Sequence, residues 1–266
     1  MTVAEYRPEH HQDEGPAFYP RLLAQAGKQP DQLRQLLPQP KAPDAATGAL
    51  SLSQILEKPD AFADLLAGIA RLRGGDVRSL ASVLHQNLAL QVLGPCTVTL
   101  FLDGHTRLPA ADAIWLDTAD PEGQWYLAPD TGADTVDEAC YIREMATLSR
   151  QWYEVFRRQL GVSAGAYWSS TGLALCAPYS ALYDSARPQE LCHQASHWLQ
   201  RFDCDARRFI DWIPFTFGEL DCAIPQRRGC CQKYRLPDGG YCGTCGIYRK
   251  ERLALVASQS PEGAVD

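Results

Sequence analysis

Residues 227–246, near the carboxyl end of the sequence, read RRGCCQKYRLPDGGYCGTCG. Four of the ten cysteines of the 266-residue chain lie here: the adjacent pair Cys230-Cys231, then Cys242 after ten intervening residues, then Cys245. The Pro-Asp-Gly-Gly turn between the two pairs can bring the four thiols together, and the surrounding glycines allow the backbone to wrap closely. Because four clustered thiolates are typical of metal coordination, the spacing C-C-x10-C-x2-C predicts a metal centre.

The spacing also bears on which metal is bound. A structural zinc site usually takes its ligands from two knuckles, each with cysteines two to four residues apart. Adjacent cysteines point in different directions and fit poorly around one small tetrahedral ion, whereas a [2Fe-2S] cluster offers two iron atoms to four cysteines. Since soft thiolates bind both metals, the residues favour an iron–sulfur cluster and leave a zinc-binding interaction module as the alternative. The segment contains no histidine, which excludes a Rieske-type centre.

Charge is distributed unevenly along the chain. The 25 Lys and Arg residues and 32 Asp and Glu residues give a net charge of −7, which argues against a nucleic-acid-binding protein because phosphate contacts need a basic face. Residues 223–252 nevertheless carry +5, whereas residues 1–222 carry −10. A cluster with four thiolates is anionic, so nearby cations favour its reduced form and raise its potential. Four basic residues around the cysteine pair are candidates for this role: Arg227, Arg228, Lys233 and Arg235.

The cysteine-rich segment resembles the C-terminal motif of the siderophore-iron reductases, a family typified by the ferric hydroxamate reductase of enterobacteria. The similarity includes the arginines before the cysteine pair, Tyr234-Arg235 after it, and the run from Tyr241 to Cys245. One departure is Gly246, because iron–sulfur cysteines are often followed by proline. The resemblance is specific but covers only this short segment.

The resemblance implies a cofactor, an activity and partners. It implies that a [2Fe-2S] cluster acts in catalysis and that its ligands are Cys230, Cys231, Cys242 and Cys245. The implied reaction is the one-electron reduction of a ferric siderophore, of the hydroxamate type, to release Fe(II). No nucleotide or flavin motif is present, so an external donor such as a ferredoxin, flavodoxin or flavin reductase would supply the electrons. Arg227, Arg228, Lys233 and Arg235 are then candidates for steering the donor or the chelate.

A second alternative follows from the same family. Its larger domain is similar to the palm-like lobe of siderophore synthetases, so the chain could be a synthetase-related protein without a redox centre. That alternative needs an ATP site, for which the sequence shows no motif.

Outside the cysteine segment, the sequence predicts an α+β protein with a mainly helical body and a small antiparallel β-meander. Apolar periodicity predicts helices over 51–72 with a break at Pro59, from Asp76 to Gly94-Pro95, from residue 134 or 135 to 160, and over 188–202. Alternating patterns predict strands at 96–102, 114–116 and 125–127. The predicted domains are a loosely ordered arm with one helix at 32–37 (1–48), an α+β body (49–222), a cluster module (223–253) and a C-terminal tail (254–266).

Other cysteines and histidines receive no catalytic role. His193 and His197 are interpreted as a solvated pair, because Gln194 stands where a metalloprotease motif has its glutamate. Cys222 is the one further candidate ligand. Five cysteines are interpreted as small buried apolar residues: Cys96, Cys140, Cys176, Cys192 and Cys204.

The sequence also bears on location. Acidic residues and histidines precede any apolar run at the N-terminus, so no secretory signal is expected. The uncharged residues 161–183 contain Pro178 together with several Gly, Ser and Thr, which favours a buried helix with a turn over a membrane span. We therefore expect a cytoplasmic protein, with peripheral association at the inner face of the membrane left open.

Overall fold

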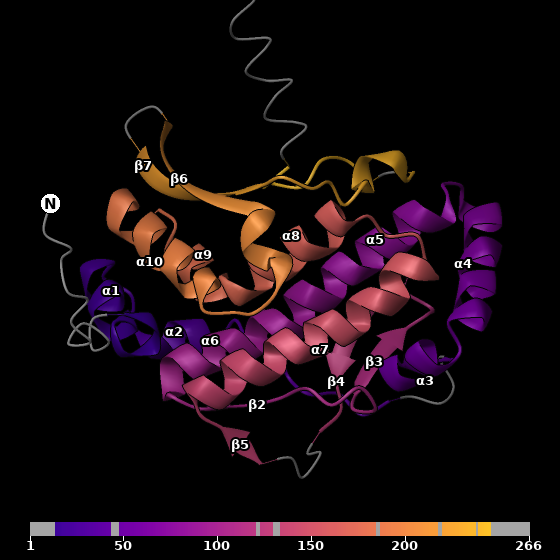
Figure 1. Cartoon of the computed structure of the whole chain (residues 1–266), viewed down its shortest axis with the longest axis horizontal. Helices are drawn as coiled ribbons and strands as arrows, with labels where there is room; N and C mark the ends of the chain where they lie inside the picture. The colour runs from indigo at the N-terminus through magenta and orange to yellow at the C-terminus, as the bar shows by residue number, and fades with distance from the viewer. Residues whose placement is uncertain are drawn as a thin grey trace, which may run out of the picture.

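The structure of the chain is a computed structural model with an α+β architecture, as predicted from the sequence (Figure 1). Within the described residues, the helices form the body and the strands form small antiparallel sheets. The described residues are 14–43, 48–120, 123–129, 134–184, 187–217, 220–237 and 239–245. The last residues of the predicted cluster module (246–253) and the predicted tail (254–266) lie outside them.

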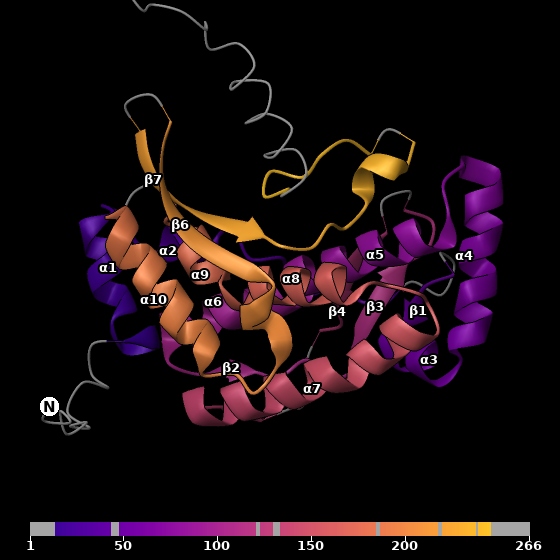
Figure 2. The ribbon, with the colours of Figure 1, turned by 45° about the horizontal axis from the view of Figure 1, so that its top comes forward.

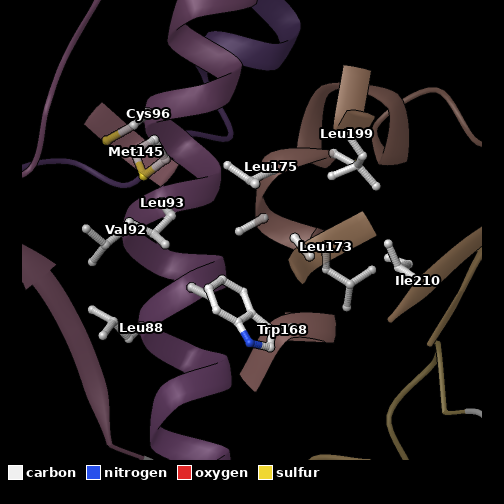
Figure 3. Close-up of a cluster of buried hydrophobic side chains, with 14 of the residues drawn as sticks. Leu88, Val92, Leu93, Cys96, Met145, Trp168, Leu173, Leu175, Leu199 and Ile210 are labelled. Atoms are coloured by element: carbon white, nitrogen blue, oxygen red, sulfur yellow. The ribbon is translucent and has the colours of Figure 1, made fainter. Parts of the chain in front are cut away.

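Two helical units form the centre of the body. The first is continuous from α5 (Val77–Leu88) through a π-helical segment, η4 (Ala89–Leu93), to α6 (Gly94–Asp103). The second is α8 (Ala164–Leu175), whose residues are buried from Ala166 onward. Figure 3 shows Leu93 of the first unit beside Trp168 and Leu175 of the second. The core therefore lies between two segments that are far apart in the sequence.

The strand predicted at residues 96–102 is wrong, because these residues form most of α6. The helix also continues through Gly94-Pro95 instead of ending there. Proline lacks an N–H and its ring clashes with the carbonyl four residues earlier in an α-helix, and the wider π-helical turn before Pro95 accommodates it. The apolar residues of α6 are buried on more than one side, so its helical period is hidden in the sequence.

The predicted strand pair at 114–116 and 125–127 is confirmed. Strand β3 (Ile114–Asp117) pairs antiparallel with β4 (Gln124–Leu127), with Leu116 opposite Trp125. β1 (Leu50–Ser51) adds to the other edge of β3, and a separate short ladder joins β2 (Thr106–Arg107) to β5 (Thr135–Val136). Because β5 uses residues 135–136, the following helix begins later than predicted.

The other predicted helices of the body are present. The break at Pro59 separates α3 (Leu52–Glu57) from α4 (Pro59–Arg73), and Asp76 caps α5 by accepting a hydrogen bond from the Ser79 N–H. The remaining helices are α7 (Glu138–Arg158), which Asp137 caps, α9 (Ala177–Ser180) and α10 (Pro188–Gln200). The helix with a turn predicted at 161–183 is therefore confirmed as α8 and α9. In the described part of the chain, no helix has the length and apolar character needed to span a bilayer.

Part of the N-terminal region is better ordered than the predicted loose arm. Residues 14–37 form η2 (Gly15–Ala17), α1 (Tyr19–Gln25) and α2 (Pro30–Arg34). Tyr19 and Leu22 are fully buried, and the Tyr19 hydroxyl donates to the Pro178 carbonyl at 2.8 Å. The expectation of a loosely ordered arm is wrong for these residues, because their apolar side chains pack into the main core. Residues 1–13 lie outside the described residues, and the predicted domain boundaries stay predictions.

A β-hairpin leads from the body to the cysteine segment. Its strands are β6 (Ile210–Phe217) and β7 (Leu220–Arg227), which follow the short helix η5 (Asp205–Arg208). Both strands contain a proline, Pro214 and Pro225, which a two-stranded sheet tolerates because each strand has an unpaired edge. Figure 2 shows the chain after β7 running across α8 and α5 towards α4, with η6 (Lys233–Arg235) at its far end.

Candidate metal centre

Glycines allow the cysteine segment to lie directly on the body. A Cβ atom on Gly229 would be 1.8 Å from the backbone oxygen of Gly165, at the start of α8. At the other end of the segment, a Cβ on Gly75 would be 2.8 Å from the Leu236 side chain. Two backbones approach this closely only where both residues lack side chains. The segment is therefore held against α8 at one end and against the α4–α5 turn at the other.

Three polar contacts hold the residues that follow the cysteine pair. Gln232 has a left-handed backbone conformation with φ of 63°, which is uncommon for a residue other than glycine. Its side-chain oxygen accepts a hydrogen bond from the Ser79 hydroxyl at 3.1 Å, and Arg235 pairs with Asp76 at 3.3 Å. The first turn of α5 thus supports the loop. The Gln232 N–H, as a result, points at the Cys230 sulfur, at 3.2 Å.

Pairwise interactions link the four predicted cysteine ligands. The sulfur atoms of Cys231 and Cys242 are 4.0 Å apart, and the charges of Cys230 and Cys245 also interact. Cys231 and Cys245 are buried, whereas Cys230 and Cys242 are partly buried. None of the ten cysteines forms a disulfide bond. The segment therefore brings the sulfur atoms together without disulfide bonds.

The environment affects the thiols in opposite ways. The pKa of Cys230 is lowered to about 7, first by its hydrogen bond with Cys231 and then by the Gln232 N–H and the positive charge of Arg227, which together outweigh burial and the charge of Cys245. The pKa of Cys242 is raised, first by its hydrogen bond with Cys231 and then by burial. Hydrogen bonds with Cys231 thus affect both the Cys230 and the Cys242 thiols.

The donor set consists of four cysteine thiols. A [2Fe-2S] cluster takes four cysteines over two iron atoms, so its sulfur ligands occur in pairs. In the described part of the chain, no group of three or more His, Cys, Asp or Glu side chains is arranged to hold a metal ion, and the Cys231 and Cys242 sulfur atoms form a pairwise contact. A tetrahedral zinc site needs four ligands around one ion. The four thiols are the donor set that an iron–sulfur cluster takes, and the zinc alternative is left to the comparison with known families.

Arg227 lies in the interior, not on the surface where a steering residue would act. Its side chain is 2% exposed, and its guanidinium donates to the hydroxyls of Ser169 at 2.9 Å and Ser170 at 2.8 Å, both on α8. A third donor of the guanidinium is 3.8 Å from the Cys242 sulfur. This burial keeps Arg227 from direct contact with a donor or a chelate, and its role in steering stays a prediction. Its predicted effect on the cluster charge remains compatible with this position.

The other three predicted cations lie closer to solvent. Arg228 forms a two-point ion pair with Asp211 at 2.6 and 2.8 Å, and Arg235 pairs with Asp76. Lys233 lies at the start of η6, beside a cavity. A role of Arg228, Lys233 and Arg235 in steering stays a prediction.

The remaining sequence candidates are not brought to the centre. The His197 ring pairs with Glu14 at 2.9 Å and is stacked on His193, so these histidines lie on one face of α10 without further ligands among the described residues. The Cys222 thiol donates to the Phe215 carbonyl within the hairpin. Cys96, Cys176 and Cys192 are buried as predicted, whereas Cys140 and Cys204 are only partly buried.

Sequence reasoning missed the residues that support the centre from the body. Ser169 and Ser170 accept hydrogen bonds from Arg227, and Ser79 donates one to Gln232. Gly165 has no side chain and so leaves room for Gly229. A weak signal existed, because adjacent serines in an uncharged buried helix need hydrogen-bond partners. The partner could not be named before the fold was known.

A cavity of about 480 Å³ lies where the cysteine segment meets the body. Its wall is mostly apolar and comes from α4, α5 and β3, while the loop between the cysteine pairs closes one side. The lining includes Leu66, Leu84 and Leu116 from the body and Lys233, Leu236 and Pro237 from the loop. A volume of this size is typical of small-molecule sites.

The geometry and the comparisons define the class of the protein. Residues 227–245 match the model of the FhuF 2Fe-2S C-terminal domain. A comparison with curated proteins gives no match. The chain is therefore an iron–sulfur protein that carries a [2Fe-2S] cluster, and its C-terminal segment is similar to that of the FhuF-type siderophore reductases.

Proposed function

We propose that the chain is a ferric-siderophore reductase that works in the cytoplasm. In the proposed reaction, the Fe(III) of a siderophore complex takes up one electron and leaves as Fe(II), and no bond of the chelator is cut. The observation that carries the proposal is the cysteine segment at 227–245 with its match to the FhuF 2Fe-2S C-terminal domain. The cluster supplies single electrons, which is the chemistry that this reaction needs.

The proposed cluster ligands are Cys230, Cys231, Cys242 and Cys245. Their mutual approach supports this assignment, as does the hydrogen bond from the Gln232 N–H to the Cys230 sulfur. Cys222 is left out, because its thiol is engaged within the hairpin.

One electron is sufficient for release because of the chelating atoms. Hydroxamate and catecholate oxygens are hard ligands, which bind Fe(III) tightly and Fe(II) weakly. A reduced complex therefore loses its iron readily. We take a hydroxamate siderophore as the substrate class, on the basis of the family resemblance.

We place the chelate in the cavity between the loop and the body. The support is proximity, since Lys233 and Leu236 of the cavity wall belong to the loop that connects Cys231 with Cys242. A chelate bound there is separated from the cysteines by only a few residues of chain. Junctions between structural units commonly supply small-molecule sites.

An external protein supplies the electrons in this proposal. A donor that presents acidic groups would meet Arg228 and Arg235, which are exposed, and Lys233, which is half-buried, on either side of the cysteine pair in the sequence. Steering between opposite charges accelerates such encounters. The lack of disulfide bonds among the ten cysteines supports a reducing compartment, and peripheral attachment to the inner face of the membrane is part of the proposal.

The first experiment is an absorption spectrum of anaerobically purified protein, with iron and acid-labile sulfide determinations. The expected result is two irons and two sulfides per chain with visible charge-transfer bands. A colourless protein with one zinc ion per chain would instead establish the zinc-binding module. Calorimetric titration with ATP tests the synthetase alternative, and we expect no binding.

The second experiment tests the reaction itself. Chemically reduced protein is mixed with a ferric hydroxamate complex, and Fe(II) is trapped with a chromogenic chelator. We expect one Fe(II) to form per reduced cluster while the cluster spectrum returns to its oxidised form. A double variant, Cys231→Ser with Cys242→Ser, is the control and should release none. A reduced protein that stays reduced in the presence of the chelate would refute the reductase proposal.

A further inference from the structure

The charge environment of Arg227 is unusual for a buried arginine. Its guanidinium is inside the protein, yet no Asp or Glu of the described residues forms an ion pair with it. Its hydrogen-bond partners on the body side are the hydroxyls of Ser169 and Ser170 and, more weakly, the Ala166 carbonyl at 3.4 Å. An isolated buried cation is strongly destabilising unless an anion compensates it. The question is therefore which anion does so.

His85, a titratable group of the body on which the charge of Arg227 acts, is unable to serve. His85 is fully buried, and burial together with the charge of Arg227 lowers its pKa to about 3. The ring stacks on Tyr167 with 3.9 Å between ring centroids. His85 is consequently neutral at physiological pH and carries no charge opposite to that of Arg227.

The cysteine side does supply an anion. One guanidinium nitrogen of Arg227 is 3.8 Å from the Cys242 sulfur, and the charge of Arg227 also lowers the pKa of Cys230. When the cluster is bound, all four cysteines are thiolates, and the cluster with its ligands is anionic in both oxidation states. Arg227 thus faces serine hydroxyls on one side and the cluster on the other.

We propose that Arg227 is the buried counter-ion of the cluster, a positioning residue that α8 fixes beside Cys242 and that raises the reduction potential. One electron entering the cluster adds one unit of negative charge, and no atom is gained or lost. A fixed positive charge at this place stabilises the reduced form more than the oxidised form. Ser169 and Ser170 orient the guanidinium so that it does not need to move when the electron arrives. The proposal rests on the cluster and is independent of which substrate the protein reduces.

The test compares reduction potentials in assembled protein, by redox titration followed by absorption and electron paramagnetic resonance. Arg227→Gln removes the charge and retains hydrogen-bond donors. We expect at least a tenfold decrease in the equilibrium constant for one-electron reduction, which corresponds to a potential lower by 59 mV. The matched control is Arg228→Gln, at the next position, because Arg228 is exposed and paired with Asp211. It should leave the potential unchanged.

Two further variants separate charge from folding. Arg227→Lys keeps the charge, so its potential should stay closer to that of the wild type than the potential of Arg227→Gln. Ser169→Ala with Ser170→Ala keeps Arg227 but removes two hydrogen bonds, so we expect a lower melting temperature and a lower cluster content. If Arg227→Gln fails to bind the cluster, the test rests on Arg227→Lys. A tenfold lower equilibrium constant for reduction of the cluster in Arg227→Lys would overturn the counter-ion assignment. Equal shifts in Arg227→Gln and Arg228→Gln would also overturn it.

Discussion

Replacing Gly229 by alanine tests whether the cysteine segment needs direct backbone contact with α8. The added methyl group would be 1.8 Å from the backbone oxygen of Gly165 and 2.6 Å from its Cα. Backbone atoms of a buried helix have little freedom to move aside. The segment itself must therefore shift by about 1 Å or more, which separates Arg227 from Ser169 and Ser170 or moves the cysteine pair.

The size of the effect follows from the cost of overpacking. Inserting a methyl group into a well-packed site costs about 1–3 kcal/mol, and more where backbone is the obstacle. For a protein of this size each kcal/mol lowers the melting temperature by roughly 2–4 °C. We expect Gly229→Ala to lower the melting temperature of the cluster-loaded protein by on the order of 5–10 °C. Its cluster content should fall as well.

The chain offers a matched control for this substitution. Gly243 also adjoins a cluster cysteine, but a Cβ there has no neighbour within 4 Å, and its backbone has no left-handed conformation. Gly243→Ala should therefore keep its iron, sulfide and melting temperature. The assay is iron and sulfide content with a thermal melt followed by visible absorption. A Gly229→Ala protein with full cluster content and an unchanged melting temperature would refute the packing argument.

Three other perturbations have defined outcomes. Serine at any of the four proposed cluster cysteines should abolish the visible spectrum, whereas Cys222→Ser should leave it intact; a normal spectrum in any of the four would remove that residue from the ligand set. Leu65→Trp at the rim of the cavity should weaken binding of a redox-inert Ga(III) hydroxamate complex about tenfold without changing the spectrum, and equal affinity would place the chelate elsewhere. The pKa of His85 is about 3 in the folded chain and about 6.5 in the unfolded chain. Between these pH values, only the unfolded chain binds a proton at His85. The free energy of unfolding should thus fall by about 2 kcal/mol from pH 7 to 5, and urea titrations of His85→Phe should lack this component.

The metal centre could be predicted largely from the sequence because its signal is chemical. Four cysteines in a fixed spacing define a ligand set wherever the segment lies. Arg227 shows the limit of this reasoning. The sequence places it among four cations that look alike, and only the fold separates the buried Arg227 from the exposed Arg228. Burial depends on α8, which is about sixty residues earlier in the chain.

The fold was predictable where one face of an element is exposed. The β3–β4 pair and the break at Pro59 follow the expected patterns because polar and apolar residues alternate or proline interrupts them. The helix α6 was missed because Cys96, Val98 and Leu100 are all buried within it, so no polar face marks the helical period. The π-helical turn before Pro95 has no sequence signature of its own.

The contacts of Gly229 and Gln232 with two different helices have a consequence for attempts to transplant the cysteine motif. A peptide or fusion protein that carries only residues 227–245 would retain the ligands but would lack the serines of α8 and the capping turn of α5. The loop conformation and the charges around the metal would then depend on the host protein. A transplanted motif would therefore also need matching residues on the surface that receives it, in the places that Ser79, Ser169 and Ser170 have in this protein.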